Sequence, residues 1–495
     1  MHDEPFNLLG ISDDDWANTP VAVRHALYSI LEIVQAQSAQ IKALQTQVRD
    51  LEAKLGQTSR NSSKPPSSDP PSAPPKPARV PRGRKAGGQP GHEGHQRPLV
   101  PPERVDEVIE LRPTACDRCQ TVLAADLPLT QTPRCTQVWE LPPIQPYITE
   151  YWQHTVCCPH CHEPVTADLP ADAPPGAFGS RATALMAILR GRYRLSLDDA
   201  AEFLSDVCQL PLSTASIVTS CERASAALAP VDTAIQATVQ AAPHLNADET
   251  PWPTETRRGW LWVAVSTLAT CFRIHASRGK AGLQQVLGDA YRGIVGSDRY
   301  LVYDQFPDGH RQVCWAHLVR NIVGLRDRYG GETLWAQALL TLTDDLFLVW
   351  HLHKDDWIDH VALQQALLPV RLAMQERLQA GVDSPHAKIA SFSREVLAHW
   401  DALWTFSRLE GIEPTNNAAE RALRHAVLWR KGCFGSRSDA GCRFVERVLS
   451  VQATCKQQQR SFFGFVTEAI QAAWAATPTP ILVAPLAVAE PLSTP

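Results

Sequence analysis

The stretch between residues 244 and 320 constrains the fold most, because strand-like and helical runs follow one another there. Strand-like segments are predicted near 244–248, 259–265, 271–277 and 293–297, with a helix near 280–290. A long helical region then leads to a basic helix that contains Glu420. Strands followed by helices predict an α/β layer. At 495 residues, the chain has room for roughly three domains of about 150 residues each.

Three carboxylates occupy informative points of this pattern. Asp248 and Asp298 each end a predicted strand, and Glu420 lies in a helix beside Arg421 and Arg424. Acids gathered from distant segments indicate a site for divalent cations, and the flanking arginines indicate a polyanionic substrate. Metal-assisted cleavage of a nucleic acid fits both features, with carboxylates arranged around two cations about 3.5–4 Å apart.

Each acid also has a structural alternative. Asp248 and Asp298 could be turn residues that end strands. Glu420 could cap its helix, since it lies three residues after Asn417, or it could pair with Arg424. The spacing alone does not choose among these acids and three neighbours: Glu249, Asp304 and Asp308.

A heptad pattern covers residues 23–55. One heptad position holds Leu27, Val34, Ile41, Val48 and Leu55, and the other holds Ile30, Leu44 and Leu51, with polar Gln37. Four heptads predict a coiled coil and therefore a homo-oligomer, with Gln37 restricting the register. The alternative is a helix that packs on its own domain.

A linker rich in Pro, Gly, Lys and Arg follows, over residues 58–104. It holds six Lys or Arg and one acid between Lys76 and Arg97, and it has too few apolar residues to fold alone. Because the net charge of the chain is -5, contacts with nucleic acid must come from local basic patches. Arg82, Arg84 and Lys85 are candidates for the DNA minor groove, and a solvated basic linker is the alternative.

Four cysteines at CxxC spacing predict a zinc ribbon. Cys116, Cys119, Cys158 and Cys161 would bind one structural Zn²⁺, with strands expected around 138–141 and 147–154. Possible substitute ligands are Cys135, Cys157, His160 and His162. A metal site in a cytosolic protein explains the 13 cysteines better than a disulfide framework does. No signal peptide and no membrane span is expected.

Residues 197–207 and 214–227 predict a helix, a turn and a second helix, with Ser213 as N-cap. This pair could read DNA as a helix-turn-helix, or it could be a plain packing unit. Most tryptophans of the later helical region are expected in its core: Trp335, Trp350, Trp357, Trp400 and Trp404.

The chain resembles the transposases of the insertion sequence sixty-six family, often called transposase C. The resemblance rests on an ordered set of motifs along nearly the full length. They are the runs Asn61-Ser62-Ser63-Lys64-Pro65-Pro66-Ser67, Gly87-Gly88-Gln89-Pro90-Gly91-His92, Asp248-Glu249-Thr250, Cys314-Trp315-Ala316-His317, Thr415-Asn416-Asn417-Ala418-Ala419-Glu420-Arg421, and Phe434-Gly435-Ser436, together with the two CxxC pairs.

The resemblance implies an RNase H-like core with a DDE triad and a helical insertion before the final Glu. It places the triad at Asp248, Asp298 and Glu420, which would hold two Mg²⁺ (or Mn²⁺) ions. In this frame Arg299 stands where the family has Gly, and Tyr300 and Tyr303 follow; Asp304 is the fallback for the middle acid. Phosphate contacts are expected from four residues of the basic helix: Arg421, Arg424, Arg430 and Lys431.

The predicted organisation has six parts. These are an N-terminal helix or coiled coil (1–57), the linker (58–104), a zinc ribbon (105–170), a helical, helix-turn-helix-like DNA-binding domain (171–240), an RNase H-like catalytic domain (241–475) with a helical insertion at about 329–410, and a disordered tail (476–495).

The implied function is that of a DNA transposase of an insertion sequence in the bacterial cytoplasm, associated with the nucleoid. Its partners would be double-stranded DNA, as element terminal repeats and target, a second copy of itself, and accessory proteins of the same element. One alternative is a transposase-derived DNA-binding regulator without catalysis. The other is a two-metal nuclease that does not transfer strands.

Overall fold

The computed structural model describes residues 12–55, 57–59, 61–62, 69, 97–255, 257–328 and 333–484. Two compact units divide the chain: residues 1–73, 151–201 and 212–495 form one, and residues 74–150 and 202–211 form the other. No helix of these described ranges has both the length and the apolar composition that a bilayer crossing requires.

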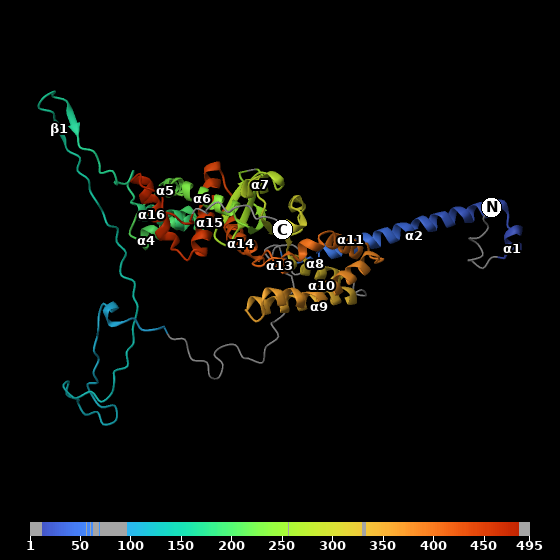
Figure 1. The fold of residues 1–495 in the computed structure, drawn as a ribbon, viewed down its shortest axis with the longest axis horizontal. Coiled ribbons are helices and arrows are strands. Elements are labelled where there is room, and N and C mark those ends of the chain that lie inside the picture. The colour runs from blue at the N-terminus through green and yellow to red at the C-terminus, as the bar shows by residue number, and fades with distance from the viewer. Residues whose placement is uncertain are drawn as a thin grey trace. The chain divides into compact units, whose positions relative to one another are not determined.

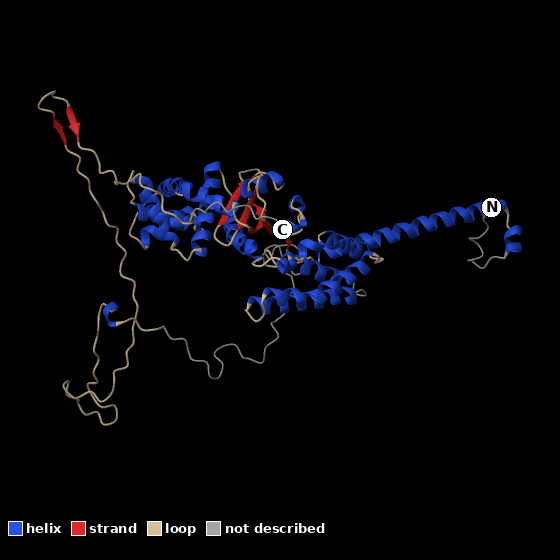
Figure 2. Cartoon of the chain, viewed as in Figure 1, coloured by secondary structure: helices blue, strands red, loops and turns tan. Residues whose placement is uncertain are grey.

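A five-stranded mixed sheet forms the centre of the larger unit (Figures 1 and 2). Its strand order is β5-β4-β3-β6-β7. Neighbouring strands β5, β4 and β3 are antiparallel, whereas β6 and β7 run parallel to β3. The strands are β3 (His244–Pro251), β4 (Trp260–Val265), β5 (Thr270–His275), β6 (Ile294–Ser297) and β7 (Arg311–Val313). The predicted strands therefore form, and the α/β fold class is confirmed.

Successive side chains of a strand point to opposite faces of the sheet, so alternate residues of these strands belong to two different cores. Leu261 and Val263 pack with Ala419 and Leu423 of α14 (Asn417–Cys433) on one face. On the other face, Trp262 packs in a larger core with residues of six helices. Those helices are α3 (Ser180–Gly191), α5 (Thr214–Ala227), α6 (Ala229–Gln240), α7 (Lys280–Leu287), α15 (Asp439–Gln457) and α16 (Phe462–Trp474).

Helix α15 also closes the outer edge of β5. Glu446, Ser450 and Thr454 lie four residues apart on one helical face and accept hydrogen bonds from alternate backbone N–H groups of the strand. The donors are Ile274 (2.7 Å), Phe272 (2.9 Å) and Thr270 (3.1 Å). At the opposite edge, the Thr405 hydroxyl donates to the carbonyl of Arg311 on β7 (2.7 Å). Both edges of the sheet are therefore covered.

A second, all-helical core lies between β7 and α14 in the sequence. Its helices are α8 (Trp315–Arg328), α9 (Thr333–Lys354), α10 (His360–Val382), α11 (Ala387–Ala398), α12 (Trp400–Leu403) and α13 (Thr405–Arg408). Trp400 and Trp404 are buried in it, and Trp335 and Trp350 pack against it. The expectation is wrong for Trp357, which is 77% exposed because it lies in the turn after α9.

The N-terminal region contains α1 (Asp13–Asn18) and the single helix α2 (Val21–Leu55). Val34, Ile41 and Val48, from one heptad position of α2, are each about half exposed. The predicted helix is present, and its self-association stays a prediction.

The described residues between α2 and α3 contain few regular elements. They are η3 (Pro102–Arg104) and the hairpin of β1 (Thr155–Cys157) and β2 (Pro164–Thr166). The strands expected around 138–141 and 147–154 are absent from this described stretch, where Val138 and Tyr147 are exposed and no strand pairs with either segment.

The predicted helix pair exists as α4 (Leu197–Asp206) and α5, and the Ser213 hydroxyl accepts a hydrogen bond from the N–H of Ser216. Helices α3, α5 and α6 share one core with the sheet, and the domain boundary predicted at residue 240 stays a prediction.

Candidate active site

Two acids lie where the parallel pairing of the sheet ends. β3 pairs with β6 as far as Asn246 opposite Gly296, and Asp248 lies two residues beyond this point. Asp298 directly follows the last residue of β6. Parallel strands bring both acids to the same edge of the sheet. The expectation that Asp248 ends its strand is wrong, because β3 stays paired with β4 as far as Pro251.

The third acid, Glu420, lies in the first turn of α14. The start of this helix is fixed to β3 by Asn416, whose side chain is buried. Asn416 Nδ2 donates to the carbonyl of Ala247 (2.8 Å), the residue before Asp248, and the Asn416 N–H donates to Cys314 Sγ (3.1 Å). The motif Thr415-Asn416-Asn417 therefore joins the helix that carries Glu420 to the strand that carries Asp248.

The acids act on one another electrostatically. Burial raises the pKa of Asp248 well above its ordinary value, and the negative charges of Glu249, Asp298 and Glu420 raise it further. A buried carboxylate with like charges around it favours its protonated form unless a cation neutralises the group. This cluster has the charge and the oxygen donors that a divalent cation prefers.

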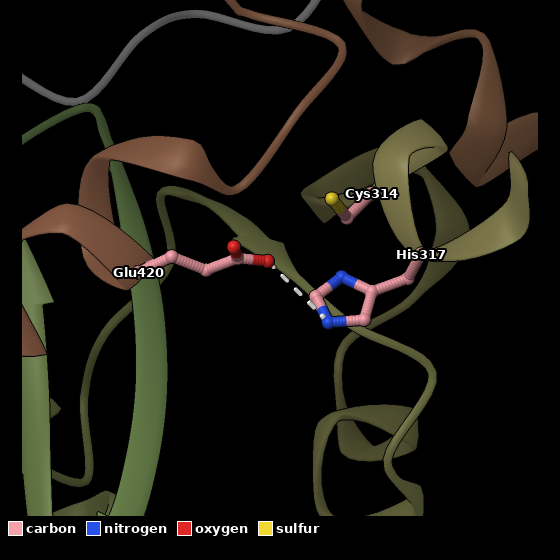
Figure 3. Close-up of side chains that lie close together, drawn as sticks. All are labelled: Cys314, His317 and Glu420. Carbon is pink, nitrogen blue, oxygen red and sulfur yellow. Dashed lines mark ion pairs between the residues drawn. The ribbon is translucent and has the colours of Figure 1, made fainter. Parts of the chain in front are cut away.

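The Glu420 carboxylate contacts two residues of α8. Arg320 Nη2 donates to both carboxylate oxygens (3.1 and 3.2 Å), and His317 Nε2 lies 3.4 Å from Oε1 (Figure 3). Burial lowers the pKa of His317. The Glu420 carboxylate therefore contacts Arg320 and His317, and it neither caps α14 nor pairs with Arg424.

A second arrangement of possible ligands involves Cys314, His317 and Glu420, whose ligand atoms all lie within 4.8 Å of one another. Among the residues that the structure describes, the acids of the predicted triad are not this close together. Burial raises the pKa of the Cys314 thiol to about 11. A thiol must lose its proton to bind a metal, so a metal bound by Cys314 would have to displace that proton.

The competing acids are engaged elsewhere. Asp304 accepts a hydrogen bond from the buried side chain of Arg311 (2.6 Å), and Arg311 also donates to the backbone carbonyl of Asp298 (2.9 Å). Glu249 binds Arg278 and Tyr303, and Asp308 begins the short helix η5 (Asp308–His310). This geometry favours Asp298 over Asp304 as the middle acid.

Arg299 replaces the glycine of the family pattern and has a structural contact of its own. Its Nη2 donates to Asn321 Oδ1 of α8 (2.8 Å), and its Nη1 donates to Glu395 of α11 (3.4 Å). The residue after Asp298 is therefore attached to the helical region between β7 and α14.

The predicted DNA-binding cations differ in their surroundings. Arg421, Arg424 and Lys431 are exposed on α14. Arg430 instead donates to Thr250 Oγ1 (3.0 Å) and to the carbonyl of Pro251, so its guanidinium fastens α14 to the end of β3. The linker candidates Arg82, Arg84 and Lys85 lie outside the described residues.

Both CxxC pairs form tight turns. Gln120 N–H donates to the carbonyl of Cys116 (2.8 Å), and His162 N–H donates to the carbonyl of Cys158 (2.9 Å). A hydrogen bond with the Thr121 side chain lowers the pKa of the Cys119 thiol, which favours the thiolate that a metal binds. The two pairs belong to different compact units, so a zinc shared by Cys116, Cys119, Cys158 and Cys161 stays a prediction.

Sequence reasoning did not assign a role to His317, Arg320 or Asn416. His317 and Arg320 lie three residues apart, which places both on one face of a helix. That spacing could have indicated a shared partner, but nothing in the sequence identified Glu420, which is 100 residues further along.

Comparisons with known proteins identify the family of the chain. A family model described as "Transposase IS66 family" matches residues 175–443, which contain all three acids. A second model, "Family of unknown function (DUF6444)", matches residues 21–98.

A relative in Sinorhizobium fredii (strain NBRC 101917 / NGR234), named "Uncharacterized protein y4hP", is 27% identical over 292 residues. The match covers 50% of this chain and 51% of the relative, so the chain spans about half the length of that protein.

Proposed function

Because the chain belongs to the transposase IS66 family, we propose that it is a DNA transposase. It would bind the terminal repeats of its own element, hydrolyse a phosphodiester to free a 3′-hydroxyl, and use that hydroxyl to attack target DNA. One observation carries the proposal: the parallel pairing of β3 and β6 brings Asp248 and Asp298 to one edge of the sheet, and Asn416 ties the start of the helix that carries Glu420 to the residue before Asp248.

The sheet supports an RNase H-like core with a DDE triad. Three antiparallel strands followed by two parallel ones, in the order β5-β4-β3-β6-β7, place one acid on the central strand and one after its parallel neighbour. The third acid comes from α14, after helices α8 to α13. We assign those helices to the insertion that the family resemblance implies.

The donor set fits Mg²⁺ or Mn²⁺, because all three candidate ligands are carboxylates. When bound, a pair of such ions would activate the attacking oxygen and stabilise the leaving oxygen. Asp248, Asp298 and Glu420 would hold them. Arg320 contacts the Glu420 carboxylate and would orient this ligand.

DNA contacts would come from exposed cations. We assign phosphate contacts to Arg421, Arg424 and Lys431 of α14, which fix the position of the duplex without reading its sequence. The linker cations Arg82, Arg84 and Lys85 would reach the minor groove. Arg430 is a weaker candidate, since it is bound to β3.

The remaining modules would support this reaction. The two CxxC turns would bind one structural Zn²⁺ through Cys116, Cys119, Cys158 and Cys161. Self-association through α2 would bring two element ends together. The protein would act on the bacterial nucleoid in the cytoplasm, with accessory proteins of the same element as further partners.

The substitution Glu420→Gln tests the proposal. Gln keeps the size of the side chain and removes the charge that helps to neutralise the cations. Mg²⁺-dependent cleavage of duplexes made from the DNA that borders this gene should collapse, while thermal stability and DNA binding persist, since binding depends on cations elsewhere.

Glu413→Gln is the matched control, because it removes the same charge from a carboxylate that pairs with Lys354 (3.0 Å). Retained cleavage in Glu420→Gln with normal thermal stability would refute the triad. A wild-type protein that binds these duplexes without cutting them would favour a DNA-binding regulator, and cleavage without strand transfer would favour a nuclease.

A further inference from the structure

Arg278 is an exposed cation held in a fixed position at the turn between β5 and α7. Its guanidinium lies over the rings of Trp260 and Tyr300, with its carbon 4.7 and 4.1 Å from the two ring centroids. Nε and Nη2 lie 3.0 and 2.8 Å from Oε1 of Glu249. The side chain is nevertheless 42% exposed, so it is held without being enclosed.

Glu249 is the anchor of this arrangement. Its side chain is 2% exposed, and its second oxygen, Oε2, accepts a hydrogen bond from the Tyr303 hydroxyl (3.0 Å). Both carboxylate oxygens are therefore engaged by protein groups. Successive residues of a strand point to opposite faces, so Glu249 and the triad candidate Asp248 leave β3 in opposite directions. These contacts make Glu249 a positioning residue for Arg278 and leave the metal ligands to the triad.

The partners of the held guanidinium connect it to two of the triad candidates. The backbone N–H of Tyr300, one of the rings under Arg278, donates to Asp298 Oδ1 (2.9 Å), and Glu249 directly follows Asp248. Two of the three guanidinium nitrogens face Glu249. The third, Nη1, has no hydrogen-bond partner among the residues that the structure describes.

We propose that Arg278 binds a phosphate of the DNA strand next to the phosphodiester that reacts. The inference rests on the proposed function, because it requires DNA at the acid cluster. A polyanion that approaches three carboxylates is repelled unless a cation receives it. An arginine that is already stacked and hydrogen-bonded loses little rotamer freedom when it binds a phosphate, and its planar fork matches phosphate geometry.

A purely structural role predicts different behaviour. If Arg278 only neutralised the buried charge of Glu249, removing that charge should make the arginine dispensable. The double variant Arg278→Ala/Glu249→Gln would then recover what Arg278→Ala loses. If Arg278 binds phosphate, the double variant stays as defective as Arg278→Ala. Gln at position 249 can still accept a hydrogen bond from Tyr303, so the double variant keeps this internal contact.

The test uses duplexes from the DNA that borders this gene, each with one neutral methylphosphonate at a single position around the cleavage site. In the wild-type protein, one methylphosphonate should slow single-turnover cleavage by about 10-fold or more, and Arg278→Ala should be slowed similarly on the unmodified duplex. The two losses should not add, because both remove the same contact. The magnitude of the slope of log K against log salt should fall by about one in Arg278→Ala.

Arg292→Ala is the control, since Arg292 precedes β6 at the end opposite Asp298 and is also exposed. Additive losses at every methylphosphonate position, or recovery in the double variant, would overturn the inference. Binding of the same duplexes is also measured in Ca²⁺ with the Glu420→Gln protein, because this measurement does not depend on cleavage. An absence of cleavage in the wild-type protein therefore refutes the proposed function, while the coupling between Arg278 and one phosphate is still measured by affinity.

Discussion

Replacing Asn416 by Ala should loosen the joint between α14 and β3. The side chain is 1% exposed, and its Nδ2 donates to the carbonyl of Ala247 at 2.8 Å. Removing one partner of a buried hydrogen bond costs about 1–3 kcal/mol. For a domain of this size, that corresponds to a Tm lower by roughly 2–10 °C. The backbone hydrogen bond from residue 416 to Cys314 Sγ does not involve the side chain and is retained.

The same change should reduce DNA cleavage more than folding. Asn416 sets the position of Glu420 relative to Asp248, and a displacement of about 1 Å in a reacting group can cost about 100-fold in rate. Asn416→Asp should be worse than Asn416→Ala, because a carboxylate cannot donate to the Ala247 carbonyl and adds negative charge beside Asp248, whose pKa burial already raises.

The assay compares Tm by circular dichroism with single-turnover cleavage in Mg²⁺. Asn417→Ala is the matched control, since it removes the same side chain from the next residue, which makes no side-chain hydrogen bond to any residue that the structure describes. If Asn416→Ala keeps wild-type Tm and cleavage, or if Asn417→Ala loses as much, Asn416 does not position α14.

Three further predictions concern charge, zinc and assembly. Burial and neighbouring acids raise the pKa of Asp248, so the stability that is present at low pH is lost as pH rises through the folded-state pKa. In EDTA, the urea midpoint should therefore fall as pH rises above about 4, and Asp248→Asn should flatten this fall and stabilise the protein at neutral pH. Mg²⁺ should raise the Tm of the wild-type protein and not that of Asp248→Asn; equal shifts would argue against a metal at Asp248. Cys119→Ser should lose zinc by elemental analysis and Cys157→Ser should keep it, because only Cys119 belongs to a CxxC pair; full occupancy in Cys119→Ser would remove the assignment. Deleting residues 1–57 should lower the mass measured by light scattering and prevent the pairing of two DNA ends while cleavage of a pre-opened substrate persists; an unchanged mass would exclude α2 as the site of association.

The sequence predicted best what depends on local pattern. The strands around Asp248 and Asp298 could be recognised because apolar residues precede each acid, and α5 could be recognised because Ser213 is an effective N-cap. The extension of β3 to Pro251 could not, because it depends on pairing with β4, which is a tertiary contact. The strand predictions around Val138 and Tyr147 failed for the same reason, since a β-prone segment forms a strand only where a partner strand is available.

The surroundings of the acids were hardest to predict. Arg430 was grouped with phosphate-binding cations because it lies on a basic helix, but its position along the helix directs it to Thr250 and Pro251. Arg278 and Glu249 are 29 residues apart in sequence, and only the hairpin of β4 and β5 brings them together. Pairings between distant segments have no signature in a single sequence. The residue types around the acids therefore indicated the chemistry of the site, but they did not indicate which residues contact one another.

The covered edges of the central sheet have a consequence for assembly. A strand edge with free N–H and C=O groups is a template on which another chain can add a strand. Here α15 occupies the donors of β5 with Glu446, Ser450 and Thr454, and Thr405 occupies an acceptor on β7. If two copies meet on DNA, as the proposed function requires, the covered edges would let them approach without joining their sheets. Contacts between the copies would then come from helices and from the DNA, and such contacts can form and break during a reaction cycle.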